Sequence, residues 1–306
     1  MKRFIIKTVF LTLVSVVMVN VIMLYGKDRH SLYSHEKNVI ISYNRLMALK
    51  DTNKIVIIAG SNGGFSINSQ MISEAFHRPV VNTSTHAGIG VRMQFEVYKD
   101  FLCKGDVVIF CPEYGGDKKR LYGESTLLRI LSTHMPFAYR KLSIPQWIFI
   151  YKYIGISFSE KKDHSRAEDF KGPYSEHALN EYGDIEWDRP HNDSIKGYRL
   201  KGIVGEDVIE YYKYIHRYTN ENEILLVFLP PTFMERDFVC NSEQIDSIAS
   251  CFEQNGIGYQ AQPSRYSFPD SLYYDTPYHM TQLGANKRTE MLIEDLNRIL
   301  SKDGKI

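Results

Sequence analysis

The residues of this 306-residue chain best suited to chemistry begin with a serine in a glycine-rich turn. Ser61 stands in the stretch Gly60-Ser61-Asn62-Gly63-Gly64, directly after a short apolar run. A serine on a strand-to-helix turn holds its hydroxyl beside the N–H groups of a helix N-terminus, which can stabilise a developing oxyanion. The same turn suits Ser61 as an ordinary helix N-cap. It lacks the glycine and lysine spacing of a phosphate-binding loop.

An aspartate and a histidine form the second candidate group, far away in the sequence. Asp275 and His279 lie in one short loop before the last predicted helix. An aspartate at this distance can bind one imidazole nitrogen and fix the tautomer, which leaves the other nitrogen as a general base. Asp270 is an alternative acid for this role. The simpler interpretation is a helix-capping His279, with Asp275 in a turn at Thr276-Pro277.

These residues need elements that bring them together, and the apolar pattern predicts such elements. Short apolar runs predict strands at 54–59, 78–82, 105–112, 223–229 and 256–261. Helical spacing predicts helices at 65–76, 91–102, 203–218, 242–254 and 281–300. Apolar strands that alternate with helices predict a parallel sheet covered on both faces. We therefore expect a three-layer, flavodoxin-like α/β domain of about five strands, with its ligand at the carboxyl ends of the strands.

The interval 115–199 interrupts this alternation. It is rich in tyrosine and tryptophan, and its ~85 residues far exceed the two to six of an ordinary connection. We expect an insertion that acts as a lid or as a substrate-binding subdomain. Its aromatic side chains suit stacking on sugar faces or packing in a core; they are Trp147, Tyr151, Tyr153, Tyr174 and Trp187.

The N-terminus carries a long apolar segment, residues 8–25, without a charged side chain. Its 18 residues are just enough to cross a bilayer core of ~30 Å as a helix. Lys2, Arg3 and Lys7 precede it, which places the N-terminus in the cytoplasm. We expect a signal anchor at 1–26, a stalk at 27–53 and an extracytoplasmic domain at 54–306. A cleaved signal peptide and a buried core helix are the alternatives.

Composition narrows the function classes. Thirty-seven basic and 36 acidic residues give a net charge of +1, and the apolar fraction of 43% is that of an ordinary globular protein. A nearly neutral chain lacks the basic surface that nucleic-acid binding requires. The histidines and the four cysteines show no metal-ligand spacing, so we predict neither a metal nor a cofactor.

Taken together, the motifs resemble the SGNH/GDSL hydrolase superfamily, in particular its membrane-anchored branch of DltD-like and polysaccharide O-acetylation proteins. Gly60-Ser61-Asn62 matches the nucleophile turn, the stretch from Asn82 to Gly88 matches the second block, and Asp275 and His279 precede the last helix as in the family. The resemblance implies Ser61, His279 and Asp275 as catalytic residues. It implies an oxyanion or substrate-binding role for Gly88 and Asn62.

Two features depart from the family pattern. Three residues separate Asp275 from His279 where the family commonly has two. The third strand ends in Cys111-Pro112-Glu113 rather than in the family's asparagine-containing block, so one oxyanion donor is missing. The hole would then rest on the N–H groups of Ser61 and Gly88. Glu113 can instead hold a substrate hydroxyl, or it is a solvated loop acid.

The sequence thus predicts a membrane-anchored serine esterase or O-acyltransferase that acts on O-acetyl groups of a cell-envelope polysaccharide. An extracytoplasmic domain has no acetyl-coenzyme A, so its acyl donor is a membrane partner protein or an already acylated glycan. The alternative is a non-catalytic protein of the same fold that binds the glycan or assists assembly. The missing asparagine favours the alternative, and the retained serine and histidine favour the enzyme.

Overall fold

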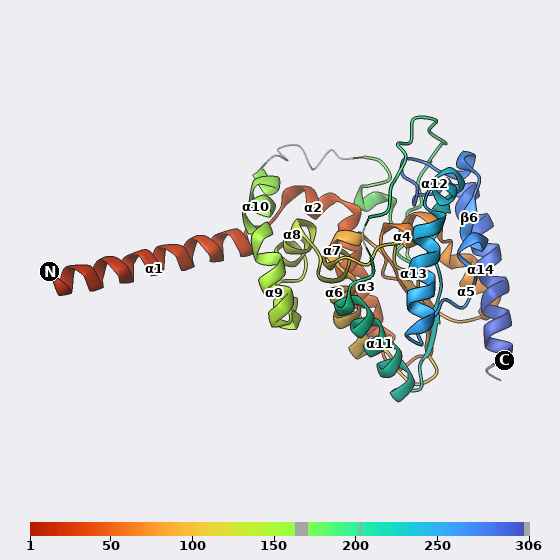
Figure 1. Cartoon of the computed structure of the whole chain (residues 1–306), viewed down its shortest axis with the longest axis horizontal. Coiled ribbons are helices and arrows are strands. Elements are labelled where there is room, and N and C mark those ends of the chain that lie inside the picture. Colours follow the sequence, from red (N-terminus) through yellow and green to blue (C-terminus); the bar gives the residue numbers. More distant parts are fainter. Residues whose placement is uncertain (163–170, 202, 303–306) are drawn as a thin grey trace.

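The computed structural model describes residues 1–162, 171–201 and 203–302, and its centre is a four-stranded parallel sheet (Figure 1). The strand order is β2-β1-β3-β4. Ile55 pairs with Val80 on one side and with Val107 on the other. The predicted parallel sheet and mixed α/β class are confirmed by β1 (Ile55–Ile58), β2 (Val80–Asn82), β3 (Val107–Phe110) and β4 (Leu225–Phe228).

Helices account for most of the remaining chain. They are α1 (Lys2–Tyr25), α2 (Arg29–Tyr33), α3 (Asn38–Ala48), α4 (Ser61–Ser66), α5 (Ser69–Phe76), α6 (Val91–Tyr98), α7 (Lys118–Tyr122), α8 (Ser125–Thr133), α9 (Ile144–Ile150), α10 (Ile154–Lys162), α11 (Glu206–Glu221), α12 (Glu235–Cys240), α13 (Ser242–Gln254) and α14 (Gln282–Lys302). The prediction for α13 has the observed bounds. The predicted helix at 65–76 is divided, because the Asn68 side chain accepts the Met71 N–H and starts α5 as a new helix.

Apolar side chains cover both faces of the sheet, because successive residues of a strand point to opposite sides. Val56 and Val108 belong to a core that α6, α11 and α13 complete. Ile57 and Ile109 belong to a second core, which α5 and α14 complete. All four strands are fully buried, which explains their continuous apolar sequences.

The prediction of a fifth sheet strand at 256–261 is wrong. The Gln260 N–H donates to the Phe228 carbonyl oxygen, as a strand would, but the Phe228 N–H donates to the Gln260 side chain. A side-chain amide has thus replaced the backbone partner, and no ladder continues along β4. A small separate sheet instead pairs β5 (Phe233–Met234) with β6 (Ser267–Phe268).

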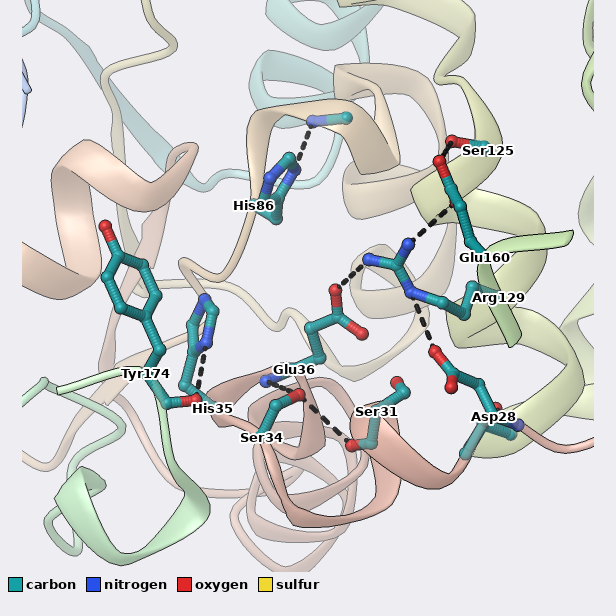
Figure 2. A network of polar contacts seen from close by, with 12 residues as sticks. Asp28, Ser31, Ser34, His35, Glu36, His86, Ser125, Arg129, Glu160 and Tyr174 are labelled. Atoms are coloured by element: carbon teal, nitrogen blue, oxygen red, sulfur yellow. Dashed lines mark hydrogen bonds and ion pairs between the residues drawn. The ribbon is translucent and has the colours of Figure 1, made fainter. Parts of the chain in front are cut away.

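The segment 27–53 packs on the domain, which differs from the stalk that we expected. The buried Asn38 side chain donates to the carbonyl oxygens of Asn82 and Ser84, next to the end of β2. Arg129 of α8 reaches both Asp28 and Glu36 of this segment (Figure 2). Buried charges and amides with partners in the domain make 27–53 an integral part of it.

The insertion 115–199 has two parts, apart from residues 163–170, which lie outside the described residues. Helices α7 to α10 enlarge the first core, for example through Leu127, Leu131 and Ile150. The stretch 171–199 crosses the carboxyl end of the sheet, where the Ile185 N–H donates to the Gly64 carbonyl oxygen. The pocket described below is lined by this second part of the insertion, and also by Arg120 of α7 and by Glu124, which precedes α8.

Helix α1 projects from one end of the body (Figure 1). Its side chains are largely exposed, and by length and composition it can cross a membrane. Near its C-terminus the Tyr139 hydroxyl donates to the Leu24 carbonyl oxygen, and α8 and α10 pack against it.

Candidate active site

Ser61 lies at the carboxyl end of β1, as the first residue of α4. Its backbone approaches two other loops closely, and the neighbouring glycines allow this. A Cβ on Gly60 would lie 2.8 Å from a Glu113 side-chain oxygen, and one on Gly63 would lie 2.1 Å from the Ser84 hydroxyl. The glycine-rich sequence therefore serves close packing of the loops around Ser61.

His279 faces Ser61 across 218 residues of sequence. The distance from Ser61 Oγ to His279 Nε2 is 2.8 Å. Phe65 of α4 stacks on the imidazole, with ring centroids 4.1 Å apart and an interplanar angle of 10°. One helix thus supplies the serine and fixes the plane of the ring that contacts it.

Asp275 binds the other imidazole nitrogen, with its Oδ1 2.8 Å from His279 Nδ1. Burial acts to raise the pKa of Asp275, but its contacts with His279 and Tyr174 outweigh burial and hold that pKa below its usual value. The carboxylate therefore accepts a hydrogen bond from the Nδ1–H of His279. In the neutral imidazole this leaves the lone pair on Nε2, which faces Ser61.

The three residues between Asp275 and His279 fit because the loop makes one tight turn. The His279 N–H approaches the carbonyl oxygen and the hydroxyl of Thr276, and the Tyr274 N–H donates to the His279 carbonyl oxygen. Asp270, the alternative acid, lies elsewhere and pairs with Arg236. The structure thus places Asp275, and not Asp270, beside His279.

Tyr174 of the insertion completes the acid side of this group. Its hydroxyl donates to Asp275 Oδ2 and lies 3.1 Å from His279 Nδ1. Burial and the Asp275 charge raise the pKa of Tyr174, so the phenol stays a donor. Asp275 therefore has hydrogen-bond partners on both carboxylate oxygens.

Glu113 contacts the candidate nucleophile directly. The Ser61 hydroxyl lies 3.1 Å from Glu113 Oε1, and Arg120 Nη1 binds Glu113 Oε2 at 2.8 Å. Glu113 is buried, so it is not the solvated loop acid that the sequence left open. Arg120 offsets its charge beside Ser61.

In the structure, the donors of two predicted oxyanion or substrate-binding residues have other partners, although Gly88 lines the pocket described below. The Gly88 N–H donates to His86 Nδ1 at 2.9 Å, because the short turn after β2 folds the His86 ring back onto it. The Asn62 side chain donates to the Cys111 carbonyl oxygen, away from the pocket. The Ser61 N–H at the start of α4 donates to no acceptor among the described residues, so it is available to bind an oxyanion.

A pocket of about 630 Å³ opens over Ser61 and His279. This volume is in the usual range for a small-molecule site. Several of its lining side chains were not singled out by the sequence, namely His35, Arg120, Glu124, Lys196 and Tyr198. His86, in the turn after β2, also lines it.

The sequence carried little signal for these additional residues. Tyr174 belonged to the aromatic set of the insertion, but nothing in its spacing linked it to Asp275. Trp147, another member of that set, stacks on Tyr139 in the first core. Within the described ranges, no group of three histidine, cysteine or acidic side chains has the arrangement of a metal site.

A comparison of the chain with family models, with curated proteins and with solved structures found no match.

Proposed function

We propose that this protein forms an acyl-enzyme at Ser61 and acts as a membrane-anchored serine esterase or O-acyltransferase of the SGNH type. The observation that carries the proposal is the chain of contacts from Ser61 Oγ through His279 to Asp275, with both distances at 2.8 Å. These distances lie within the range of a nucleophile bound to its base. A serine that served only as a helix cap would have no need of this partner.

The mechanism follows from which atom holds each proton. His279 Nε2 takes the Ser61 proton as Oγ attacks the ester carbonyl, and Asp275 stabilises the imidazolium that forms. The Ser61 N–H faces the developing oxyanion. The tetrahedral species expels the alcohol, which receives the proton from Nε2. Water or a sugar hydroxyl then gives its proton to Nε2 and attacks the acyl carbon. The acyl–Oγ bond breaks, and Nε2 returns the proton to Ser61 Oγ.

We propose the substrate class from the position of the pocket relative to the membrane and from the residues that line the pocket. With α1 as an anchor and the basic N-terminus in the cytoplasm, the pocket lies outside the cell, close to the membrane. The stretch 171–199 walls the pocket with polar side chains, including Lys196 and Tyr198. We therefore propose O-acetyl groups of a cell-envelope polysaccharide as the target. The donor for a transfer reaction is a membrane partner protein or an acylated glycan.

The strand order supports the flavodoxin-like fold that this proposal includes. The order β2-β1-β3-β4 matches the beginning of the flavodoxin-like order, in which ligands bind outside the carboxyl ends of the strands. Ser61 follows β1 and the Gly88 turn follows β2, so both lie at this edge.

The non-catalytic alternative is favoured by a different observation. Glu113 faces Ser61, and the Gly88 N–H is occupied by His86. An oxyanion would therefore meet a carboxylate and one backbone donor, where loss of a single donor already costs ~10²–10³ in rate. In this alternative the same pocket binds an acetylated glycan without cleaving it.

Labelling of the full chain in detergent with a serine-reactive phosphonate separates the two candidates. The expected result is one adduct on Ser61, located by mass spectrometry. It should disappear in Ser61→Ala and in His279→Ala, because the base is needed to activate the hydroxyl. Turnover of an aryl acetate should fall by at least about 10³-fold in both variants.

Ser194→Ala is the matched control, since Ser194 lines the same pocket. This variant should label and turn over as the wild type does. Equal turnover of aryl acetate by wild type and Ser61→Ala would instead leave the glycan-binding alternative.

A further inference from the structure

Helices α9 and α10 carry apolar side chains that nothing in the described chain covers. Ile144 and Ile148 of α9 are 77% and 74% exposed, and Ile156 of α10 is 49% exposed. Tyr151, between the two helices, is 58% exposed. Single exposed apolar residues are common, but a group on two consecutive helices marks an interaction surface. We call these four residues the α9–α10 surface.

This surface lies beside the apolar anchor helix. Tyr151 and Gly155 face Val16 and Val19 of α1 across a shallow groove. Figure 1 shows α9 and α10 at the end of the body from which α1 emerges, and their axes run across the direction of α1. Helices that lie across a membrane-spanning helix are oriented in the plane of the bilayer.

The length of α1 sets the depth at which α10 must lie. Val16 and Val19 precede the end of α1 at Tyr25 by six to nine residues, which is roughly 9–14 Å at 1.5 Å per residue. If the bilayer stopped below α10, only residues 4–15 would remain to cross it. These give about 18 Å, against a hydrocarbon core of ~30 Å. The bilayer must therefore extend up to the level of Tyr151 and Gly155, where the α9–α10 surface meets α1.

We propose that the α9–α10 surface inserts into the headgroup region of the outer leaflet of the bilayer. The protein would then be attached to the membrane by an in-plane helix pair as well as by α1. The proposal rests on the anchoring role of α1 in the proposed function and not on catalysis. Partial insertion to a depth of ~5–10 Å is typical of in-plane helices with an apolar face.

Aromatic and basic side chains at the rim fit this position. Trp147 is partly buried beside the exposed face of α9. The Lys152 ammonium lies 4.0 Å from the centre of the Phe149 ring and is itself exposed. Tryptophan and lysine are typical of the headgroup region, where the ring or the alkyl chain is buried and the polar end is hydrated.

Lipid explains the surface better than a second copy of the chain, because the surface is continuous with α1. A protein partner would have to contact both α9 and the middle of a membrane-spanning helix. The exposed faces of α1 and of the α9–α10 surface both need an apolar environment, and the bilayer alone can supply it to both.

Depth-dependent fluorescence quenching of the full chain in liposomes tests the proposal. A fluorophore is attached at Ile148→Cys, or at Ile144→Cys as a second position, in a chain whose Cys103, Cys240 and Cys251 are serine; Cys111 is buried and stays. Quenching by spin-labelled acyl chains is compared with quenching by aqueous iodide. Leu283→Cys is the matched control, because Leu283 is a 59% exposed residue of α14, on the far side from α1 (Figure 1).

Lipid quenching at Ile148 at least fivefold stronger than at Leu283, with iodide quenching weaker by a similar factor, supports the proposal. Iodide quenching at Ile148 equal to that at Leu283 overturns it. Protection from both quenchers also overturns it, because a protein then covers the surface. None of these readouts needs turnover, so a failure here is distinct from a failure of the Ser61 labelling.

Discussion

The Ser61 hydroxyl has one proton and two acceptors close by. His279 Nε2 is at 2.8 Å and Glu113 Oε1 at 3.1 Å. A hydroxyl that donates to His279 is aligned for proton transfer to this base, whereas one that donates to Glu113 points its proton away from it. The Arg120 guanidinium on the far side of Glu113 reduces the carboxylate's pull on that proton. The balance between these two acceptors decides how often Ser61 is ready to react.

We predict that Glu113→Gln raises kcat for an aryl acetate by roughly 10- to 100-fold. Arg120 donates only, so it binds the amide oxygen and turns the amide N–H₂ toward Ser61. A carboxylate that opposes an oxyanion is thereby replaced by a donor that stabilises it. Steady-state kinetics of the purified full chain measure this change.

Glu124→Gln is the control for this prediction. Glu124 lines the same pocket, and its substitution removes the same carboxylate charge. It should leave kcat unchanged. A fall in kcat on Glu113→Gln would show that the carboxylate itself serves the reaction, for example by holding a substrate hydroxyl.

At the scale of elements, one arginine joins segments that are distant in sequence. Arg129 of α8 contacts Asp28 before α2, Glu36 in the following 3₁₀ turn and Glu160 of α10 (Figure 2). Burial acts to raise the pKa of Glu36, but the charge of Arg129 outweighs it and lowers that pKa to about 2. Glu36 is thus charged and buried, and it depends on this partner.

We predict that Arg129→Met lowers the free energy of unfolding by about 3–5 kcal/mol, because it leaves buried carboxylates without their partner. Urea unfolding of the full chain in detergent, followed by tryptophan fluorescence, measures the loss. Adding Glu36→Gln to Arg129→Met should restore part of it, since one uncompensated charge is then removed.

Lys104→Met tests whether any lost ion pair would have the same effect. Lys104 pairs with Glu223 at the surface, with side chains 74% and 62% exposed. The expected change is under about 1 kcal/mol. A loss in Arg129→Met no larger than this would contradict a structural role for the network.

At the scale of the whole molecule, several imidazoles are buried or half-buried. Burial is the largest cause of the lowered pKa of His35, which falls to about 4, and it also lowers the pKa values of His86, His134 and His216. For His35 the electrostatic interactions with His86 and His279 act in the same direction as burial, and Glu36 acts against them. The folded protein therefore keeps these rings neutral where the unfolded chain protonates them.

We predict that stability falls as the pH drops below about 6.5, and that His35→Gln reduces this fall. The unfolded chain binds a proton at His35 from its ordinary pKa of ~6.5, while the folded chain does so only near 4. The stability that the neutral His35 contributes is present in full above pH 6.5, and it is lost progressively as the pH falls to about 4. By pH 5 the loss of stability amounts to roughly 2 kcal/mol.

Urea midpoints at pH 7.5 and pH 5.0 measure this dependence in the wild type and in His35→Gln. The difference between the two midpoints should be smaller in the variant. The lowered pKa of Glu36 acts mainly below pH 4.5, outside this window. An equal difference in both proteins would show that His35 is not the principal buried base.

Much of this protein was predictable from local sequence. Four of the five strands, α13 with its bounds and the position of α14 follow from apolar periodicity, which is a local property. The apolar helix α1 follows from an uncharged stretch of sufficient length. The pairing of Ser61 with His279 was expected from the resemblance of the motifs and not from strand geometry, because His279 follows no strand of the four-stranded sheet.

Tertiary structure alone decided the remaining features, since each depends on a contact between distant residues. Gln260 takes the place of a strand partner at Phe228, and Arg129 fixes the segment that we expected to be a stalk. Tyr174 meets Asp275 across 101 residues, and Glu113 meets Ser61 across 52. The spacing of residue types describes one turn or one strand. It therefore does not specify which side chains that are distant in sequence form a hydrogen bond with each other.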